Sequence, residues 1–350
     1  MAETVTNPTI VRRLFSDSEL GPVHAYDLSN GFQTVTVLDL GCVIQSWFVE
    51  DRDIVCGFEN ANAYLHSGTY YGAVVGRCCN RMKSLLIKGK DYPVTFNENW
   101  TNHLHGGFHG FDKKIWDVST FATETECGLV LSCLSPDGEE DYPGNLKTTV
   151  TYTLSGNEFR FDVDAVSDQD TAVNLTGHSY FNLNGPGGDI LDHILYIPAW
   201  YISECDELHI PTGNRLPIWD GPLDFNKPKP IGKDIHADHK QMTPWRGYDN
   251  NYHLRKETGM TLAARAEGND LAIEVLTDLP CLQLYTGNYT EDGPMKYGLP
   301  QSQFRAFCLE TQMEPDFTHT NGNYLPAGEH YRCKTIYRLE RKKDSPEPRW

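Results

Sequence analysis

The sequence predicts an all-β protein, a large antiparallel sandwich or barrel with few short helices. Three observations favour this class. Apolar and polar residues alternate with a period of two in several segments, as in strands that bury one face of a sheet. Segments with helical periodicity are few. Finally, 30 glycines and 20 prolines divide the 350 residues into many short stretches, which is typical of sandwiches and barrels.

Residues 31–50 are rich in β-branched and aromatic side chains and are interrupted by Gly41. We therefore expect two strands there, with a turn or bulge between them. A hairpin is expected over residues 85–94, because Gly89 can supply the positive φ of a tight turn. Residues 128–134 form another short apolar run, which predicts a strand.

The clearest strand pattern covers residues 146–166, where a turn at Gly156 and Asn157 joins two arms. Apolar residues alternate with polar ones along both arms, which predicts a hairpin in a sheet with one buried face. The same alternation returns over residues 262–277 and 331–339. These segments are therefore expected to form strands of antiparallel sheets.

We expect a single domain, 1–350, because the middle of the sequence contains neither a low-complexity linker nor a strong internal repeat. The last residues, 341–350, are charged and contain prolines, which predicts a flexible tail.

The formal net charge is −18, from 48 acidic and 30 basic residues, and no basic patch could follow a phosphate backbone. Nucleic acid is therefore excluded as an expected partner, and a neutral small molecule is favoured. The N-terminus lacks the pattern of a signal peptide, and no apolar run is long enough to span a bilayer. We expect a cytoplasmic protein without a membrane partner. Its ten cysteines include no CxxC pair and are expected to be mostly buried, reduced thiols.

Several stretches carry polar side chains that packing alone does not require. His178 lies in GHSYFNLNG, and Glu310 follows 132 positions later in FCLETQMEPD. The other stretches are GRCCNRM (76–82), NHLHGGFHGFD (102–112), GYDNNY (247–252) and LQLYTGN (282–288). Each has an ordinary structural explanation, such as a surface salt bridge for Arg81 or a hydrogen-bonded core position for His178.

A metal site is an alternative for the second of these stretches. His103, His105 and His109 have the spacing HxHxxxH, and Asp112 follows closely. Three histidines can hold a zinc ion that keeps one position open for water. Two glycines lie between His105 and His109, and no stronger signature such as HExxH is present. We therefore expect no metal.

The order of the stretches is more specific than any one of them. GRCCNR, NHLHGG, GHSYFNLNG, GYDNNY, LQLYTGN and LETQMEPD are followed by LPAGEHYRCKTIYRL. This series closely resembles the motifs of the aldose 1-epimerase, or galactose mutarotase, family, from about residue 30 to residue 340. The resemblance implies a large antiparallel β-sandwich with a sugar-binding cleft. It also implies interconversion of the α and β anomers of a free hexose, galactose or glucose, without a cofactor.

The resemblance also implies roles for particular residues. The general acid falls on His178 and the general base on Glu310. The sugar-contacting residues fall on Asn80, Arg81, His105, Asp249 and Gln283. The chain departs from the family at Gly177, where members often have asparagine before the histidine.

The chemistry of mutarotation agrees with these residues. One base removes the proton of the anomeric hydroxyl, and one acid protonates the ring oxygen, so that the ring opens and recloses on either face. We expect nearby carboxylates to raise the pKa of His178 above its reference value of about 6.5. Two alternatives stay open: an epimerase of hexose 6-phosphates or other aldose derivatives, and a sugar-binding protein without catalysis.

Overall fold

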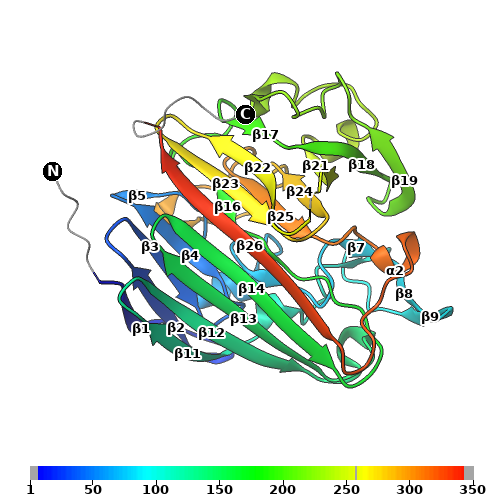
Figure 1. Cartoon of the computed structure of the whole chain (residues 1–350), viewed down its shortest axis with the longest axis horizontal. Helices are drawn as coiled ribbons and strands as arrows, with labels where there is room; N and C mark the ends of the chain where they lie inside the picture. The colour runs from blue at the N-terminus through cyan, green and yellow to red at the C-terminus, as the bar shows by residue number, and fades with distance from the viewer. Residues whose placement is uncertain (1–6, 257, 343–350) are drawn as a thin grey trace.

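The structure is a computed structural model that describes residues 7–256 and 258–342. Strands dominate it, and all pairs of neighbouring strands are antiparallel. The largest sheet has nine strands, and Figure 1 shows its long members running side by side diagonally across the molecule. In spatial order they are β11 (Asp117–Ala122), β12 (Glu126–Ser135), β13 (Leu146–Ser155), β14 (Glu158–Ser167), β26 (His330–Arg341), β23 (Leu271–Thr277), β22 (Thr261–Glu267), β17 (Ile194–Tyr196) and β20 (Lys229–Pro230).

Two further sheets have six and five strands. The six-stranded sheet runs β16 (Tyr180–Phe181), β25 (Phe307–Gln312), β24 (Cys281–Tyr285), β21 (Asp249–Leu254), β18 (Ala199–Cys205) and β19 (Pro211–Pro217). The five-stranded sheet runs β1 (Thr9–Ser18), β2 (Gly21–Ser29), β3 (Gln33–Leu38), β4 (Ile44–Val49) and β5 (Arg52–Asp53).

Short elements complete the fold. Three strand pairs are β7 (Arg81–Met82) with β10 (His103–Leu104), β6 (Val74–Val75) with β15 (Thr176–Gly177), and β8 (Ser84–Ile87) with β9 (Lys90–Pro93). The α-helices of the described residues are α1 (Ala61–His66) and α2 (Phe317–Thr320). Single 3-10 turns are η1 (Phe111–Lys113), η2 (Glu139–Asp141), η3 (Ile231–Lys233), η4 (Thr243–Trp245) and η5 (Lys296–Gly298). The predicted all-β class with few short helices is confirmed.

The sandwich is held together by aromatic side chains between the three large sheets. Trp47 of β4 is fully buried, and its ring lies 5.1 Å from Phe159 of β14, 5.9 Å from Tyr337 of β26 and 6.0 Å from Phe181 of β16. Its indole Nε1 donates a hydrogen bond to Gln33 Oε1 at 2.8 Å, so the one polar atom of the ring is satisfied. One side chain therefore ties all three sheets into a common core.

The predicted strands are confirmed. Residues 31–50 form β3 and β4, and the 146–166 segment forms β13 and β14 around a turn in which Gly156 has φ +54°. The hairpin at 85–94 is β8 and β9, and its Gly89 has φ +76°. The remaining predictions correspond to β12, β22, β23 and β26.

Two further expectations concern the cysteines and the C-terminal tail. Eight of the ten cysteines are buried, which confirms that most are interior thiols. Of the expected tail, 341–350, Arg341 is the last residue of β26, and residues 343–350 lie outside the described residues. No helix within 7–256 or 258–342 is long and apolar enough to cross a membrane.

Candidate active site

A pocket of about 240 Å³ opens over one face of the six-stranded sheet. It is smaller than the sites of roughly 300–1,000 Å³ that hold drug-sized ligands, and so suits a small molecule such as a monosaccharide. All seven residues singled out from the sequence line this pocket. The full lining is Gly68, Thr69, Tyr70, Asn80, Arg81, Glu98, Leu104, His105, His178, Tyr180, Asp249, Gln283, Tyr285, Tyr289, Glu291 and Glu310.

Three of the seven residues come from neighbouring strands of the sheet. Asp249 lies on β21, Gln283 on β24 and Glu310 on β25, with Gln283 directly opposite Glu310. Gln283 Nε2 donates to Asp249 Oδ1 at 2.6 Å. Successive residues of a strand point to opposite faces, so the sheet holds these three side chains in a row on the pocket side.

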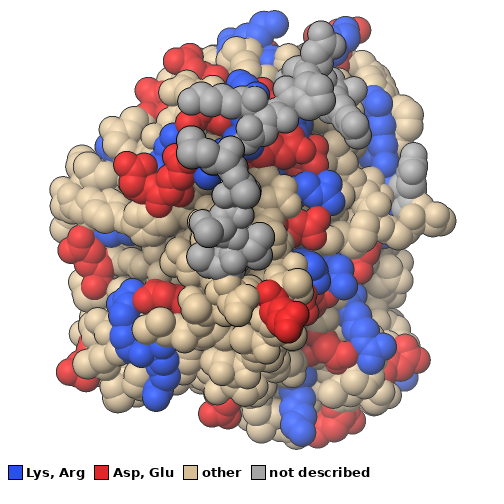
Figure 2. Space-filling model, turned by 60° about the vertical axis from the view of Figure 1, so that its left-hand side comes forward, with Lys and Arg blue, Asp and Glu red and all other residues tan. Residues whose placement is uncertain are grey.

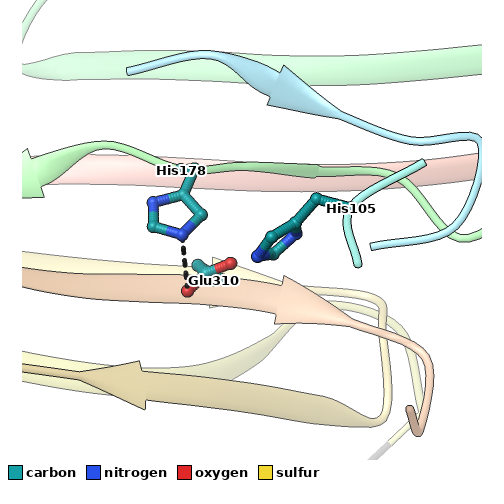
Figure 3. Close-up of side chains that lie close together, drawn as sticks. All are labelled: His105, His178 and Glu310. Carbon is teal, nitrogen blue, oxygen red and sulfur yellow. Dashed lines mark ion pairs between the residues drawn. The ribbon is translucent and has the colours of Figure 1, made fainter. Parts of the chain in front are cut away.

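The register between β16 and β25 brings His178 to Glu310. Tyr180 is paired with Cys308, so continuing the antiparallel ladder by two positions sets His178 opposite Glu310. Two backbone hydrogen bonds fix His178 there: its N–H donates to the Ala73 carbonyl at 2.8 Å, and its carbonyl accepts from the Gly72 N–H at 2.9 Å. Figure 3 shows the imidazole facing the carboxylate, with Nε2 3.7 Å from Glu310 Oε1.

Asn80, Arg81 and His105 enter the pocket from the small β7–β10 pair. Asn80 and His105 both have left-handed backbone, with φ of +62° and +53°, so the chain turns sharply at each. The Asn80 N–H donates to His105 Nδ1 at 3.2 Å, and Asn80 Nδ2 donates to Gln283 Oε1 at 3.0 Å. This second bond joins the β7–β10 pair to the six-stranded sheet.

A residue that the sequence analysis missed, Glu98, holds Arg81 in place. Arg81 Nε and Nη2 donate to the two carboxylate oxygens of Glu98 at 2.7 and 2.9 Å. Its Nη1 lies 3.8 Å from Asp249 Oδ2. Burial by itself would lower the pKa of Arg81, but Asp249 and Glu98 outweigh it and keep the guanidinium charged. No sequence signal marks Glu98, because its contact with Arg81 arises only when the segment before β10 folds back onto β7.

Burial sets the proton affinities of the proposed acid and base. It lowers the pKa of His178 to about 4. It raises the pKa of Glu310 well above its usual value, with the charge of Asp249 adding to the rise and Arg81 opposing it. The side chains are only 6% and 2% exposed, so desolvation exceeds the effect of neighbouring charges. The expectation that carboxylates would raise the pKa of His178 is therefore wrong.

The histidine spacing that we considered as an alternative metal site does not bring its side chains together. His103 uses both ring nitrogens in hydrogen-bonding contacts, with the Thr95 carbonyl at 2.6 Å and the Tyr142 hydroxyl at 2.8 Å. His109 lies on the surface, away from the buried side chains of His103 and His105.

The donor atoms of a different trio, His105, His178 and Glu310, do lie within 4.8 Å of one another (Figure 3). This trio does not suit a resident metal. His105 Nδ1 accepts the Asn80 N–H, so the proton of the neutral ring is on Nε2. A histidine that ligates a metal instead donates its other N–H to a neighbouring acceptor. The arrangement suits a hydrogen-bond donor to a ligand oxygen.

Comparisons with known proteins agree with one another. The profile of the family described as aldose 1-epimerase matches residues 24–338. The galactose mutarotase of Sus scrofa is 38% identical over 346 residues, which cover 94% of this chain and 98% of that protein. The aldose 1-epimerase of Escherichia coli (strain K12) is 30% identical over 326 residues, 89% of this chain and 93% of that protein. The crystal structure of galactose 1-epimerase from Lactobacillus acidophilus NCFM superimposes with a TM-score of 0.87 at 25% identity, covering 95% and 99% of the two chains.

Proposed function

The chain belongs to the aldose 1-epimerase family and is an isomerase that acts on free sugars, and we propose that His178 and Glu310 carry the protons in this reaction. The observation that supports the assignment most directly is their approach to 3.7 Å inside the pocket. Because the Sus scrofa relative is a galactose mutarotase, we propose galactose as a substrate, with glucose as a second.

In the proposed reaction, Glu310 accepts the proton of the anomeric hydroxyl while protonated His178 gives a proton to the ring oxygen. The C1–O5 bond breaks, and the aldehyde end of the open chain can rotate. For closure on the other face, protonated Glu310 returns a proton and neutral His178 takes one back. The pair holds one proton in both states, so each turnover leaves it unchanged.

The pKa shifts of His178 and Glu310 decide which protonation state of the pair is favoured before the sugar binds. Burial favours neutral His178 and protonated Glu310, which is the form from which ring closing starts. Ring opening starts from the charged form, which needs stabilisation. Hydrogen bonds from sugar hydroxyls to the Glu310 carboxylate supply it, as does the charge of Arg81, because both favour the ionised acid.

The remaining polar residues suit the task of holding the sugar. Asn80, Gln283 and Asp249 form a hydrogen-bonded chain across the pocket. Amide and carboxylate groups in fixed positions match a set pattern of hydroxyl donors and acceptors. His105 is proposed to donate from Nε2 to a sugar oxygen. One acid and one base suffice for these proton transfers, and the reaction has no net redox change, so the proposal includes no cofactor.

The alternative of a hexose 6-phosphate substrate fits the pocket poorly. The described side chains that line it include four carboxylates, those of Glu98, Asp249, Glu291 and Glu310, against one arginine, Arg81. Arg81 is already paired with Glu98. A doubly charged phosphate would therefore meet net repulsion.

We further propose a cytoplasmic protein without nucleic-acid or membrane partners. Ten free thiols suit a reducing compartment. On the face in Figure 2, lysine and arginine side chains lie among acidic ones and do not form one continuous basic area. The net charge of −18 also opposes binding to phosphate backbones.

The test of the acid–base pair is polarimetry of freshly dissolved α-D-galactose with Glu310→Gln and His178→Asn. Each substitution removes one proton-transfer group and is expected to lower kcat by about 10²- to 10⁴-fold. Glu314→Gln is the matched control, since Glu314 is also buried but does not line the pocket, and it is expected to keep near wild-type kinetics. Wild-type rates in Glu310→Gln would remove Glu310 from the mechanism.

A further inference from the structure

Cys308 lies beside the imidazole of His178, next to the ring nitrogen that does not face Glu310. Its Sγ is 3.6 Å from Nδ1, while Nε2 is 3.7 Å from Glu310 Oε1. Cys308 and Glu310 are two positions apart on β25, so their side chains leave the same face of the strand. The ring therefore bridges two neighbours on one strand, with one nitrogen at each.

The thiol of Cys308 is a side-chain hydrogen-bonding partner of Nδ1, and the backbone of His178 itself also favours a protonated ring. Aromatic rings also surround the imidazole: Tyr180 stacks on it at 5.1 Å, and the rings of His105, Tyr70 and Tyr285 lie at 5.2, 6.0 and 6.3 Å. Aromatic faces fix the plane of an imidazole but do not select which nitrogen carries its proton. A polar contact at Nδ1 can determine which nitrogen carries the proton.

The proposed chemistry places a clear demand on Nδ1. When His178 is protonated, both nitrogens carry hydrogen. After Nε2 has given its proton to the sugar, the neutral ring must keep the proton on Nδ1, so that Nε2 is free to take one back. The partner of Nδ1 must therefore accept a hydrogen bond in both states.

A neutral thiol can meet this demand: its sulfur is a weak acceptor for Nδ1–H, and its S–H, which could otherwise donate to an unprotonated Nδ1, is only a weak donor. Cys308 is fully buried, and this burial, reinforced by the charge of Glu310, raises the pKa of its thiol well above the usual value, so it stays uncharged. A carboxylate at this place would also accept the bond. Its charge, however, would favour the imidazolium and hold the proton that His178 must release.

We propose that Cys308 is a positioning residue that keeps the proton of neutral His178 on Nδ1 and thereby makes Nε2 the atom that exchanges protons with the sugar. The inference rests on the proposed role of His178 and deepens it. Cys308 does not line the pocket, so its effect is expected in kcat and not in KM.

The experiment combines kinetics with ¹⁵N spectra of the histidine rings in the wild type, Cys308→Ser and Cys308→Ala. Loss of one hydrogen bond in Cys308→Ala is expected to lower kcat about tenfold at unchanged KM and to move the proton of neutral His178 toward Nε2. Serine keeps an acceptor, so Cys308→Ser is expected to stay within about threefold of the wild type. His178→Asn identifies the His178 signals among the 13 histidines.

Cys56→Ala is the matched control, because Cys56 is 1% exposed and belongs to the same apolar cluster as Cys308. It loses an equal volume without touching His178. A wild-type ring with its proton on Nε2, or equal kcat values in Cys308→Ala and Cys56→Ala, would overturn the proposal. The spectrum of the wild type decides the matter even where Cys308→Ala does not fold. A wild type that does not accelerate mutarotation would instead contradict the proposed function, whichever tautomer it shows.

Discussion

The pairing of Arg81 with Glu98 gives a prediction whose size follows from the contacts. The Glu98 carboxylate accepts three hydrogen bonds: from Arg81 Nε at 2.7 Å, from Arg81 Nη2 at 2.9 Å and from Asn102 Nδ2 at 2.8 Å. Its Oε2 takes the bonds of Arg81 Nε and Asn102, and its Oε1 takes that of Nη2. In Glu98→Gln one of these oxygens becomes an NH₂ group, which faces a donor and cannot accept.

The substitution therefore removes one charge-assisted bond and the ion pair, and keeps the bonds to the other oxygen. A hydrogen bond to a charged group contributes about 1.5–3 kcal/mol. The Arg81 and Glu98 side chains are 13% and 25% exposed, so solvent partly screens their interaction. We therefore expect the loss of interaction free energy to be about 1–2 kcal/mol. The freed guanidinium is expected to shift toward Asp249 Oδ2, now 3.8 Å from Nη1.

We expect kcat/KM of Glu98→Gln to fall about 5- to 30-fold, because 1–2 kcal/mol corresponds to that factor. The change should appear mainly as a higher KM, since Arg81 is proposed to hold the sugar and not to transfer protons. Initial rates of galactose mutarotation at several sugar concentrations separate the two constants. Glu158→Gln, which alters an Arg338–Glu158 pair outside the pocket, is the control and should match the wild type. Unchanged KM and kcat/KM in Glu98→Gln would refute the positioning role.

Three further predictions concern stability. His193 is fully buried, accepts the Leu183 N–H at 3.1 Å, and has a pKa lowered to about 4 by burial. Since the unfolded chain binds this proton below about pH 6.5, stability should fall by about 2 kcal/mol from pH 7 to pH 5. His193→Gln should lose less than the wild type over this range in urea denaturation, whereas the exposed His66→Gln should not differ from it. Gly177→Ala should stabilise the fold by about 0.4–1 kcal/mol at unchanged kcat, because the added Cβ meets only Tyr337 Oη at 3.9 Å. Gly106→Ala should lower the free energy of unfolding by at least about 1–3 kcal/mol, since Gly106 has φ +94° and the added Cβ would lie 1.7 Å from the Gly76 carbonyl oxygen. A large loss of activity in Gly177→Ala would instead point to a direct role for that position.

The strands that could be predicted are those with one buried and one solvated face. In β14, buried Phe159, Phe161 and Val163 alternate with more exposed polar residues, so the pattern is visible in the letters alone. Strand β1 (Thr9–Ser18) was not predicted, because it lies at the edge of its sheet and most of its residues are exposed. Strand β20 has only two residues, one of them a proline, and carries no readable period.

The candidate site residues could be named from the ordered motifs, but the shifts of their pKa values could not be predicted. The motifs lead us to expect carboxylates near His178, which predicts a raised pKa. The sequence does not show that the imidazole is 6% exposed, and this burial reverses the direction of the shift. Glu98 was missed for a related reason. Its contact with Arg81 depends on the pairing of Leu104 with Arg81 between β10 and β7, which no local pattern encodes.

The meeting of His178 with Glu310 depends on one strand register. A slip of one residue between β16 and β25 would set Leu309 or Thr311 opposite His178, and their side chains leave the other face of the strand. Tyr180 and Phe181 hold the register: the Tyr180 hydroxyl donates to the Thr69 carbonyl at 2.8 Å, and Phe181 is packed against Trp47 and Phe307. The apolar residues of the GHSYFNLNG motif therefore bear on the proposed catalysis, because the core contacts that they make align the proposed acid with the proposed base.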